Sequence, residues 1–480
     1  MCLHPTPIEP VPEDTVRVAQ AAFPKGNVYL QMRDVLGVIY DDAQFLDLFA
    51  KRGRPVEAPW RLALVTVVQF AEGLSDRQAA EAVRGRIDWK YALGLELTDP
   101  GFDFSLLSEF RTRLVAHAAE RRLLDALLDA RKHRGVLKAR GRQRTDSTHI
   151  VGLLRTMNRS ERVAESLRAA LNALAGEASG WLRERAPAGW YERYGRRIED
   201  YRLPKGQEAR HAYVAQVGAD GHTLLTMLAA PETPVALRHL REVELLGQMW
   251  EQQFEVHGEG QWRLRDADAM PPASDRVESP YEPEVRFATK RQMHWVGYKV
   301  HLTETCDDDL PHLITQVETT IAPATDLGQL ARIQQSLADQ DLLPSEHLVD
   351  AGYTRASNSV ASREQHQIDL LGPADEDHRW QSRVDDGLVA EQFQLDWDTH
   401  RATCPQGHAT IRWRQTPTAR KRTMIHIDFD PADCLPCPAR TRCTRATTGT
   451  GARSLTVQPR AACAAAHGGV RHPLCASGRH

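Results

Sequence analysis

The stretch from His294 to Tyr353 constrains the fold of this chain more than any other, because two hydrophobic periodicities follow one another within it. Apolar residues first recur at every second position, which is typical of a strand with one buried face. They then recur at every third or fourth position, which predicts an amphipathic helix. A strand, a helix and a strand in this order return to the same sheet. The predicted strands are 294–302, 312–323 and 346–353, and the predicted helix is 326–343.

An aspartate stands at the end of the last of these strands. Asp350 is followed at once by Ala351 and Gly352, where the chain can turn sharply out of the sheet. Ligands and metals of open α/β sheets bind at the carboxyl edges of strands. The position of Asp350 therefore predicts a carboxylate at a functional edge of the sheet.

Composition limits the classes of protein to consider. The chain has 480 residues and a formal net charge of -3, so any surface that binds nucleic acid has to be local. No run approaches the roughly 18 apolar residues that span a bilayer, and we expect no membrane contact. The amino terminus lacks the regions of a signal peptide, which makes the cytoplasm the expected compartment. Four of the eight cysteines are clustered, which favours a metal site over a disulfide scaffold.

The amino-terminal part of the chain has a helical pattern. Residues 1–24 are rich in proline and are predicted to be a disordered or extended lead-in. Residues 25–130 are predicted to form an all-α domain of a DNA-binding type, with Pro59 and Ser75 as signals for helix starts. The predicted helices are 35–49, 58–74, 75–95 and 104–130.

Two of these helices resemble a helix-turn-helix. One ends near Gly73, and the next begins after a short turn. In that arrangement Arg77, Arg84 and Arg86 would face DNA. The alternative is a plain helical bundle whose arginines are solvated, because such patterns are common by chance.

A basic run leads into a second acid. Residues 131–144 hold seven Lys and Arg and no acid, which is usually the mark of a solvated linker. Here Arg140, Arg142 and Arg144 lead directly into a β-rich segment that contains Asp146, so they are candidates for phosphate contact. Taken alone, Asp146 is explained by a turn or a cap, since Asp-Ser-Thr readily bonds its own backbone.

The middle of the chain carries aromatic residues among arginines. Within 155–210 this pattern suits stacking on bases and contact with phosphates, and it suits equally a helical insertion whose aromatics pack inward. Residues 212–230 are either a hairpin around Ala-Asp-Gly or the end of one helix and the start of another. Residues 266–287 are rich in proline and acids, and are predicted to be a surface loop.

Four cysteines form the other group of candidate ligands. Cys404 begins a Cys-Pro-x-Gly-His motif, and Cys434, Cys437 and Cys443 follow as Cys-x2-Cys-x5-Cys. Soft ligands on tight turns are what a structural Zn²⁺ site requires, and His408 could replace one cysteine. The alternative is a loop with reduced, unligated cysteines.

Several ordered motifs together resemble the DDE transposases of bacterial insertion sequences, over roughly Phe23 to Arg460. They are TDSTHI around Asp146, WVGYKVHL around Lys299, VETTIAPATD, HLVDAGY around Asp350, and the cysteine motifs. The resemblance implies an α/β RNase H-like catalytic domain over 131–390, an all-α amino-terminal domain and a small Cys-rich β segment over 391–460. The wide separation of the two acids implies a large insertion in the catalytic domain at about 155–285.

The resemblance also implies an activity, which is the cleavage and joining of DNA ends by metal-dependent phosphoryl transfer. Asp146 and Asp350 would be the catalytic acids and the ligands of Mg²⁺ or Mn²⁺. Lys299 would be a candidate for phosphate contact. The implied partner is double-stranded DNA, at the terminal repeats of the element and at its target, bound by a homo-oligomer.

The sequence departs from this family in one respect. Family members carry a third acid, a Glu near the carboxyl end, whereas no Asp or Glu follows Asp433 here. Residues 461–480 lose every helical or strand pattern and are predicted to be an aberrant tail, as after a truncation or a frameshift. The expectation is a transposase without catalytic activity. Two alternatives are a DNA-binding relic without catalysis and a metal-dependent nuclease that uses the same two aspartates.

Overall fold

The chain consists of two compact units in the computed structural model. The first comprises Met1–Gly141 and Thr305–Thr315, and the second comprises Arg142–Glu304 and Gln316–His480. The predicted aberrant tail, 461–480, lies outside the described residues. The structure describes residues 2–5, 7–53, 56–132, 135, 137–152, 157–258, 260–290, 292–373, 379–417, 423–446 and 451–457.

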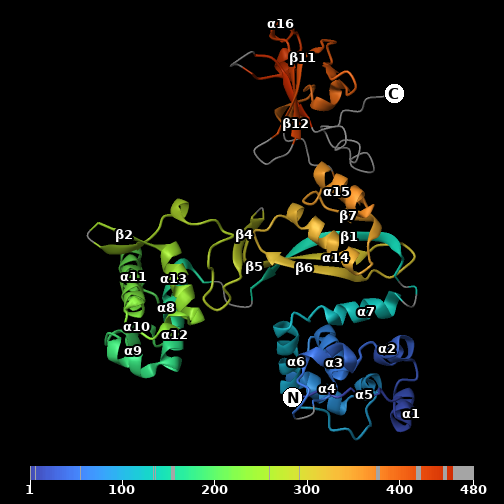
Figure 1. Ribbon diagram of the computed structural model, residues 1–480, viewed down its shortest axis with the longest axis vertical. Coiled ribbons are helices and arrows are strands. Elements are labelled where there is room, and N and C mark those ends of the chain that lie inside the picture. The colour runs from blue at the N-terminus through green and yellow to red at the C-terminus, as the bar shows by residue number, and fades with distance from the viewer. Residues whose placement is uncertain are drawn as a thin grey trace. The chain divides into compact units, whose positions relative to one another are not determined.

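The first unit is helical, as the sequence predicts (Figure 1, blue and cyan). Its core contains large side chains from several different helices, such as Trp60, Trp89 and Phe110. The helices are α1 (Glu13–Ala22), α2 (Val28–Leu36), η1 (Asp42–Leu48), α3 (Pro59–Glu72), α4 (Asp76–Gly85), α5 (Ile87–Leu93), α6 (Ser105–Ala116) and α7 (Arg122–Lys132).

The prediction of a disordered or extended lead-in is wrong from Glu13 onward, where α1 begins. Ala19 of α1 is fully buried and packs with Leu30 of α2 and Tyr91 of α5. The Thr15 hydroxyl donates a hydrogen bond of 2.8 Å to the carbonyl of Leu95. The segment is ordered because residues four apart in the helix meet partners that lie far away in the sequence.

Two predicted helices of this unit are each divided in the structure. The predicted helix 75–95 becomes α4 and α5, and the break falls at Arg86, whose backbone is extended. The predicted helix 104–130 becomes α6 and α7, with Ala118 at a positive φ of 48° between them. The expected start of α4 is confirmed, since Ser75 and Gln78 form a capping box.

A mixed sheet of six strands forms the centre of the second unit. Its order is β4-β5-β1-β7-β8, and β6 also pairs with β5. The three predicted strands and the β-rich segment around Asp146 are confirmed, and β4 adds a strand at the end of the predicted surface loop. The strands are β1 (Arg140–Val151), β4 (Arg286–Lys290), β5 (Met293–Thr305), β6 (Ile314–Ile321), β7 (Pro344–Val349) and β8 (Asp369–Leu371).

The predicted crossover helix follows β6 and packs on the sheet. It is η4 (Asp326–Gly328) continued by α14 (Leu330–Asp339), and α15 (Ala356–His366) lies beside α14 (Figure 1). Leu330, Ile333 and Leu337 of α14 are buried against side chains of β7 and β8. These leucines and the isoleucine are the residues whose spacing predicted the helix.

Beneath these helices the core of the sheet contains a chain of buried polar side chains. The Thr145 hydroxyl lies 2.7 Å from the Thr303 hydroxyl and 2.6 Å from Nε2 of His347. Gln334 of α14 contacts the other ring nitrogen of His347, at 3.4 Å, and accepts a hydrogen bond from Ser362 of α15. The five side chains join three strands and two helices through partners that compensate for their burial.

An inserted helical body separates β1 from β4, as predicted (Figure 1, green). Its core consists of apolar and aromatic side chains from its long helices and the β2–β3 hairpin. The elements are α8 (Arg159–Glu177), α9 (Ser179–Arg185), α10 (Trp190–Tyr194), η2 (Asp200–Arg202), α11 (Gln207–Ala229), α12 (Val235–Arg238), α13 (Arg241–Gln253), β2 (Phe254–His257), β3 (Gln261–Leu264) and η3 (Ala267–Ala269).

Both interpretations of residues 212–230 are wrong, because α11 runs without interruption through Ala-Asp-Gly. A Cβ atom on Gly218 would lie 2.7 Å from Cβ of Trp262, and one on Gly221 would overlap the indole ring of Trp250. Asp220 between them accepts hydrogen bonds from Tyr194 and Arg193. These small and acidic residues serve helix packing here, and not a turn.

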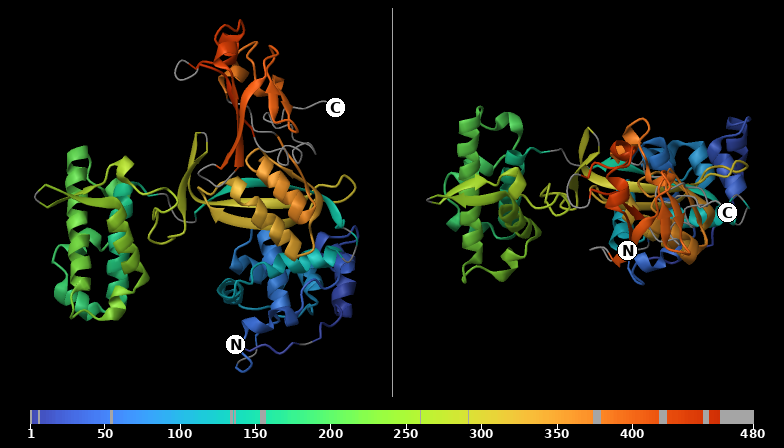
Figure 2. Two further views of the ribbon diagram at one scale, coloured as in Figure 1. Left: turned by 45° about the horizontal axis from the view of Figure 1, so that its top comes forward. Right: turned by 90° about the horizontal axis from the view of Figure 1, so that it is seen from above.

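The carboxyl-terminal described part is a small β segment, shown in orange and red in Figure 2. Phe393, Ile427, Phe429 and Leu455 contribute to its own hydrophobic core. Its elements are η5 (Trp380–Arg383), η6 (Ala390–Gln392), β9 (Gln394–Asp396), β10 (Arg401–Thr403), β11 (Thr410–Pro417), β12 (Thr423–Phe429), α16 (Pro431–Cys434), α17 (Arg440–Cys443) and β13 (Ser454–Val457).

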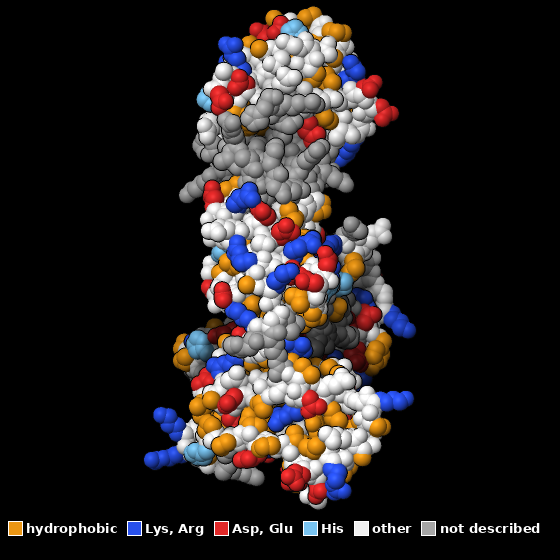
Figure 3. Space-filling view, turned by 90° about the vertical axis from the view of Figure 1, so that its right-hand side faces the viewer, with side chains coloured by type: hydrophobic (Ala, Val, Ile, Leu, Met, Phe, Trp, Pro, Cys, Tyr) orange, Lys and Arg blue, Asp and Glu red, His pale blue; other side chains and the backbone are white. Residues whose placement is uncertain are grey.

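Two surface properties agree with the composition. None of the helices in the described part of the chain has the length and apolar character needed to cross a membrane. On the face seen in Figure 3, basic and acidic side chains are intermingled, as expected from the small net charge. A surface for a charged partner would therefore have to be local.

A pair of glycine substitutions tests the packing of the inserted body. Gly221→Ala should destabilise it by about 1–3 kcal/mol, because the added methyl group collides with Trp250. Gly176→Ala in α8 should stabilise it by roughly 0.5–1 kcal/mol, since a Cβ there meets nothing and alanine favours the helix. Urea unfolding of both variants measures the difference. Equal effects would contradict the described packing.

The buried histidine of the sheet should make stability depend on pH. Burial lowers the pKa of His347 to about 4, whereas an exposed histidine has a pKa of about 6.5. Between these values the unfolded chain binds more protons, so the free energy of unfolding should fall as the pH decreases from about 6.5 to 4, by up to roughly 3 kcal/mol. Unfolding of wild type and His347→Gln across this range measures it. The same slope in both proteins would disprove the contribution.

Candidate active site

Asp350 lies where the sequence predicts, directly after the last residue of β7. Its Oδ1 accepts a hydrogen bond of 2.9 Å from the backbone N–H of Gly352, where the chain turns away from the sheet. Burial raises the pKa of Asp350, and the negative charges of Asp326 and Asp146 raise it further, against the effect of the Gly352 hydrogen bond. Three carboxylates therefore influence one another at this edge.

Asp146 lies on β1, the strand between β5 and β7. It is exposed, whereas Thr145 beside it is buried, because neighbouring side chains of a strand point to opposite faces. The Asp146 carboxylate accepts a hydrogen bond of 2.7 Å from the backbone N–H of Ser147. The structure thus brings the two predicted acids close enough to interact electrostatically, from two adjacent strands.

Asp326 is a third acid that the sequence reasoning missed. A Cβ atom on Gly352 would lie 2.9 Å from Oδ2 of Asp326 and 3.1 Å from Oδ1 of Asp350, so these two oxygens border one small space that glycine leaves open. Asp326 is the last residue of the VETTIAPATD motif and the first of the predicted helix 326–343. Its place in this motif is the sequence feature that could have identified it as a site residue.

Lys299 is held by this third acid. Its Nζ lies 3.0 Å from Oδ1 of Asp326 and donates a 2.7 Å hydrogen bond to the carbonyl of Ala324. The Lys299 side chain is only 14% exposed. In this arrangement the Lys299 ammonium is paired with Asp326 inside the protein, whereas a phosphate contact would require a free ammonium.

A histidine and a tyrosine support the same edge from within. Nδ1 of His301 lies 2.5 Å from the Tyr353 hydroxyl, and both side chains are fully buried. Burial lowers the pKa of His301. Burial, together with the charge of Asp326, raises the pKa of Tyr353. At neutral pH this hydrogen bond therefore joins two uncharged groups, and it ties β5 to the turn after Asp350.

The acids are near one another but are not arranged as a complete metal site. No group of three or more His, Cys, Asp and Glu side chains in the described part of the chain is close enough to hold a metal ion. The chemistry of the donor set nevertheless suits a hard cation, because Mg²⁺ binds through one or two carboxylates and retains several waters.

The arginines predicted to face DNA from the first unit have partners within it. Arg77 lies over the ring of Phe104, at 4.3 Å, and Arg84 pairs with Glu81 at 3.1 Å. Arg86 forms ion pairs of 2.6 Å with Glu72 and 2.7 Å with Asp88. Arg86 is therefore engaged within its own unit, because the buried carboxylate of Asp88 requires a cation beside it.

The basic run is also partly engaged. Arg142 pairs with Glu346 at 3.1 Å, and Arg144 pairs with Glu304 at 2.6 Å. Arg140 begins β1 with a positive φ of 57° and is exposed. Arg142 and Arg144 link β1 to the neighbouring strands β7 and β5. Their ion pairs are exposed enough for the acids to be replaced by other anions.

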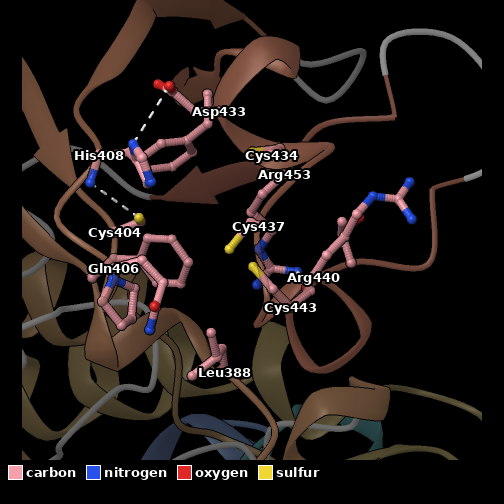
Figure 4. A pocket seen from close by; sticks show the side chains of 14 residues that line it. Leu388, Cys404, Gln406, His408, Asp433, Cys434, Cys437, Arg440, Cys443 and Arg453 are labelled. Carbon is pink, nitrogen blue, oxygen red and sulfur yellow. Dashed lines mark hydrogen bonds and ion pairs between the residues drawn. The ribbon is translucent and has the colours of Figure 1, made fainter.

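The four predicted cysteines line one pocket of the β segment (Figure 4). Burial and, to a smaller extent, Cys434, Cys404 and Cys437 raise the pKa of the Cys443 thiol to about 11, against the lowering effect of Arg453. The backbone N–H of His408 points to the Cys404 sulfur at 3.4 Å, and the His408 ring pairs with Asp433. The four cysteines thus share one pocket, but they are not gathered at the distances of metal ligands.

The comparisons with known proteins agree with these motifs. The family model described as a transposase domain (DUF772) matches residues 17–113, over most of the first unit. The family model described as a transposase DDE domain matches residues 403–472, which include all four cysteines of the pocket. No curated protein and no solved structure matches the chain. Both ends of the described fold thus match transposase family models, and the two matches support a DDE transposase of an insertion element.

Proposed function

We propose that this chain cleaves and joins the DNA ends of an insertion element by metal-dependent phosphoryl transfer. The observation that carries the proposal is the electrostatic coupling of Asp350 with Asp146 and Asp326 at one edge of the sheet. A carboxylate whose pKa is raised by neighbouring acids is stabilised by a bound cation, and clustered acids of this kind mark functional sites.

The arrangement of the sheet supports an RNase H-like catalytic domain. The strand that carries Asp146 lies inside the sheet, with β5 and β6 on one side and β7 and β8 on the other. The second acid follows β7, its direct neighbour. A fold of this class requires acids on adjacent strands, because both must reach the same metal ions.

Asp146 and Asp350 would hold Mg²⁺ or Mn²⁺ in this proposal, and Asp326 would supply the third carboxylate. Such ions activate a nucleophile and stabilise the leaving oxygen. The protein positions these acids by means of the Gly352 N–H, the Lys299 ammonium and the buried bond between His301 and Tyr353. A role for Asp326 would make the chain active without an acid after Asp433.

A DNA-binding protein without catalysis is the second candidate. It is favoured by the Lys299–Asp326 ion pair, which neutralises one carboxylate of the site. In either case we propose that a homo-oligomer of this chain binds double-stranded DNA at the terminal repeats and the target. The side chains that would contact the DNA are Arg77, Arg84, Arg140, Arg142 and Arg144. The cytoplasm, where bacterial DNA lies, is the compartment that this function requires.

We also propose that the β segment binds a structural Zn²⁺. Cys404 after β10, Cys434 at the end of α16, Cys437 and Cys443 at the end of α17 provide four soft donors that line one pocket. The thiolate required by a metal is disfavoured in the pocket by burial and by the neighbouring sulfurs. A bound dication would reverse this effect, and its binding would contribute to folding.

Cleavage assays on a duplex that carries the element end test the acids. With Mg²⁺ or Mn²⁺ the wild type should nick this duplex, and Asp146→Asn, Asp350→Asn and Asp326→Asn should each lower the rate by about a hundredfold or more. Asp339→Asn is the matched control, since it removes an exposed carboxylate of α14 that bonds only Gln335 among described residues. A wild type that binds the duplex but never cuts it would favour the second candidate. Unchanged cleavage by Asp350→Asn would refute the proposed site.

Metal analysis tests the cysteine site. The purified chain should contain about one Zn²⁺ per molecule. Cys437→Ser should lower this content and the melting temperature, whereas Cys306→Ser, outside the pocket, should preserve both. Treatment with a chelator should lower the melting temperatures of wild type and Cys306→Ser, but not that of Cys437→Ser. A zinc-free wild type of full stability would show that the pocket is not a metal site.

A further inference from the structure

One irregular segment of the inserted body plays no part in the proposed catalytic site. Residues 190–206 lie between α9 and α11 and contain only the short elements α10 and η2. Trp190, Tyr194, Ile198 and Leu203 are buried in the core of the body and anchor the segment along its length. Its outward side chains are therefore presented from a fixed backbone.

Two tyrosines of this segment point outward. Tyr191 is 84% exposed and Tyr201 is 70% exposed, although tyrosine rings are usually at least half buried. Two ring carbons of Tyr191 lie 3.4 Å from the position that a Cβ atom on Gly195 would take, so the ring lies beside this glycine. The guanidinium of Arg202 lies 5.2 Å from the centre of the Tyr201 ring. Neither ring contributes to the core.

The unpaired charges of the segment are mostly positive. Arg196, Arg197 and Lys205 are exposed and have no partner in the described part of the chain. The acids Glu199 and Asp200 are already paired, with Arg202 and Arg210 respectively. Glu192 is the one acid of the segment without a cation among the described residues. The segment therefore has three unpaired cations and one unpaired acid among the described residues.

We propose that residues 190–206 bind single-stranded DNA, with Tyr191 and Tyr201 stacked on bases and Arg196, Arg197 and Lys205 on phosphates. Stacking requires base faces that a duplex hides, and cations beside aromatic rings are the recurring elements of sites for single strands. An acidic protein would engage the cations and leave the rings unused. This inference rests on the proposed function, because cleavage of an element end supplies unpaired nucleotides.

Binding of a fluorescent oligothymidylate to the full chain, in EDTA and over a series of salt concentrations, tests the inference. The double variant Tyr191→Ser with Tyr201→Ser should bind at least about fivefold more weakly at an unchanged salt dependence. The double variant Arg196→Gln with Arg197→Gln should also bind more weakly, and its slope of log affinity against log salt should be smaller by about 1.4, or 0.7 for each lost phosphate contact.

A matched control separates this surface from general attraction by positive charge. Arg263→Gln with Arg265→Gln removes the same charge from the same body, but these arginines are paired with Glu255. Its affinity should change by less than about twofold. Equal weakening by both pairs of arginine substitutions would overturn the inference, as would a tyrosine variant that binds the oligonucleotide like wild type or loses duplex binding to the same extent.

The two proposals fail independently. The binding assay contains no metal and uses none of the three acids, so Asp350→Asn should bind the oligonucleotide like wild type. If the acids abolish cleavage but the tyrosine and arginine variants bind normally, the inference is wrong and the proposed function stands. If nothing is cleaved but these variants lose binding, the inference stands without the proposed chemistry. Unchanged melting temperatures should show that the exposed substitutions leave the body folded.

Discussion

The edge of the sheet that carries Asp146 and Asp350 depends on hydrogen bonds made inside the sheet. Thr145 and His347 are bonded to each other in the core, and each lies one to three residues from one of the two predicted acids. In a low-dielectric interior an unpaired polar group is costly, so the register that satisfies these two side chains is strongly preferred. Asp146 and Asp350 then emerge from neighbouring strands in a fixed relation. A purely apolar core would tolerate small shifts of β1 against β7 more easily, and the polar chain from Thr303 to Ser362 opposes them.

Local periodicity explains how much of this could be predicted. Alternation along 294–302 and the helical spacing over 326–343 depend on neighbours in the sequence, and the structure confirms β5 and α14 within a few residues. The carboxyl end of a strand is equally local, so Asp350 could be found. Asp326 could not, because its meaning comes from Lys299 on another strand and from the space above Gly352.

The same distinction between local pattern and distant contacts explains where the structure differs from the expectations drawn from the sequence. Ala-Asp-Gly suggests a turn, yet in α11 the glycines make room for Trp250 and Trp262, which come much later in the chain. Arg86 suggests a contact with DNA, yet it neutralises Asp88 within its own unit. A charged or small residue has both a surface use and a packing use, and only tertiary contacts decide between them. The lead-in became helical at Glu13 for the same reason, since its partners lie in α2 and α5.

The inserted body is attached to the sheet through β1 and β4, the two strands that flank β5. The N–H of Gly152, just after β1, bonds to the carbonyl of Val296 in β5, and Gly297 has no side chain because the backbone of β1 passes too close. The body leaves from β1 and its chain returns through β4, the partner of β5. A module whose two connections lie on either side of one strand can be exchanged for a loop, or for a different module, without changing the sheet register. Evolution could thus exchange the inserted body while the acids of the sheet stayed in place.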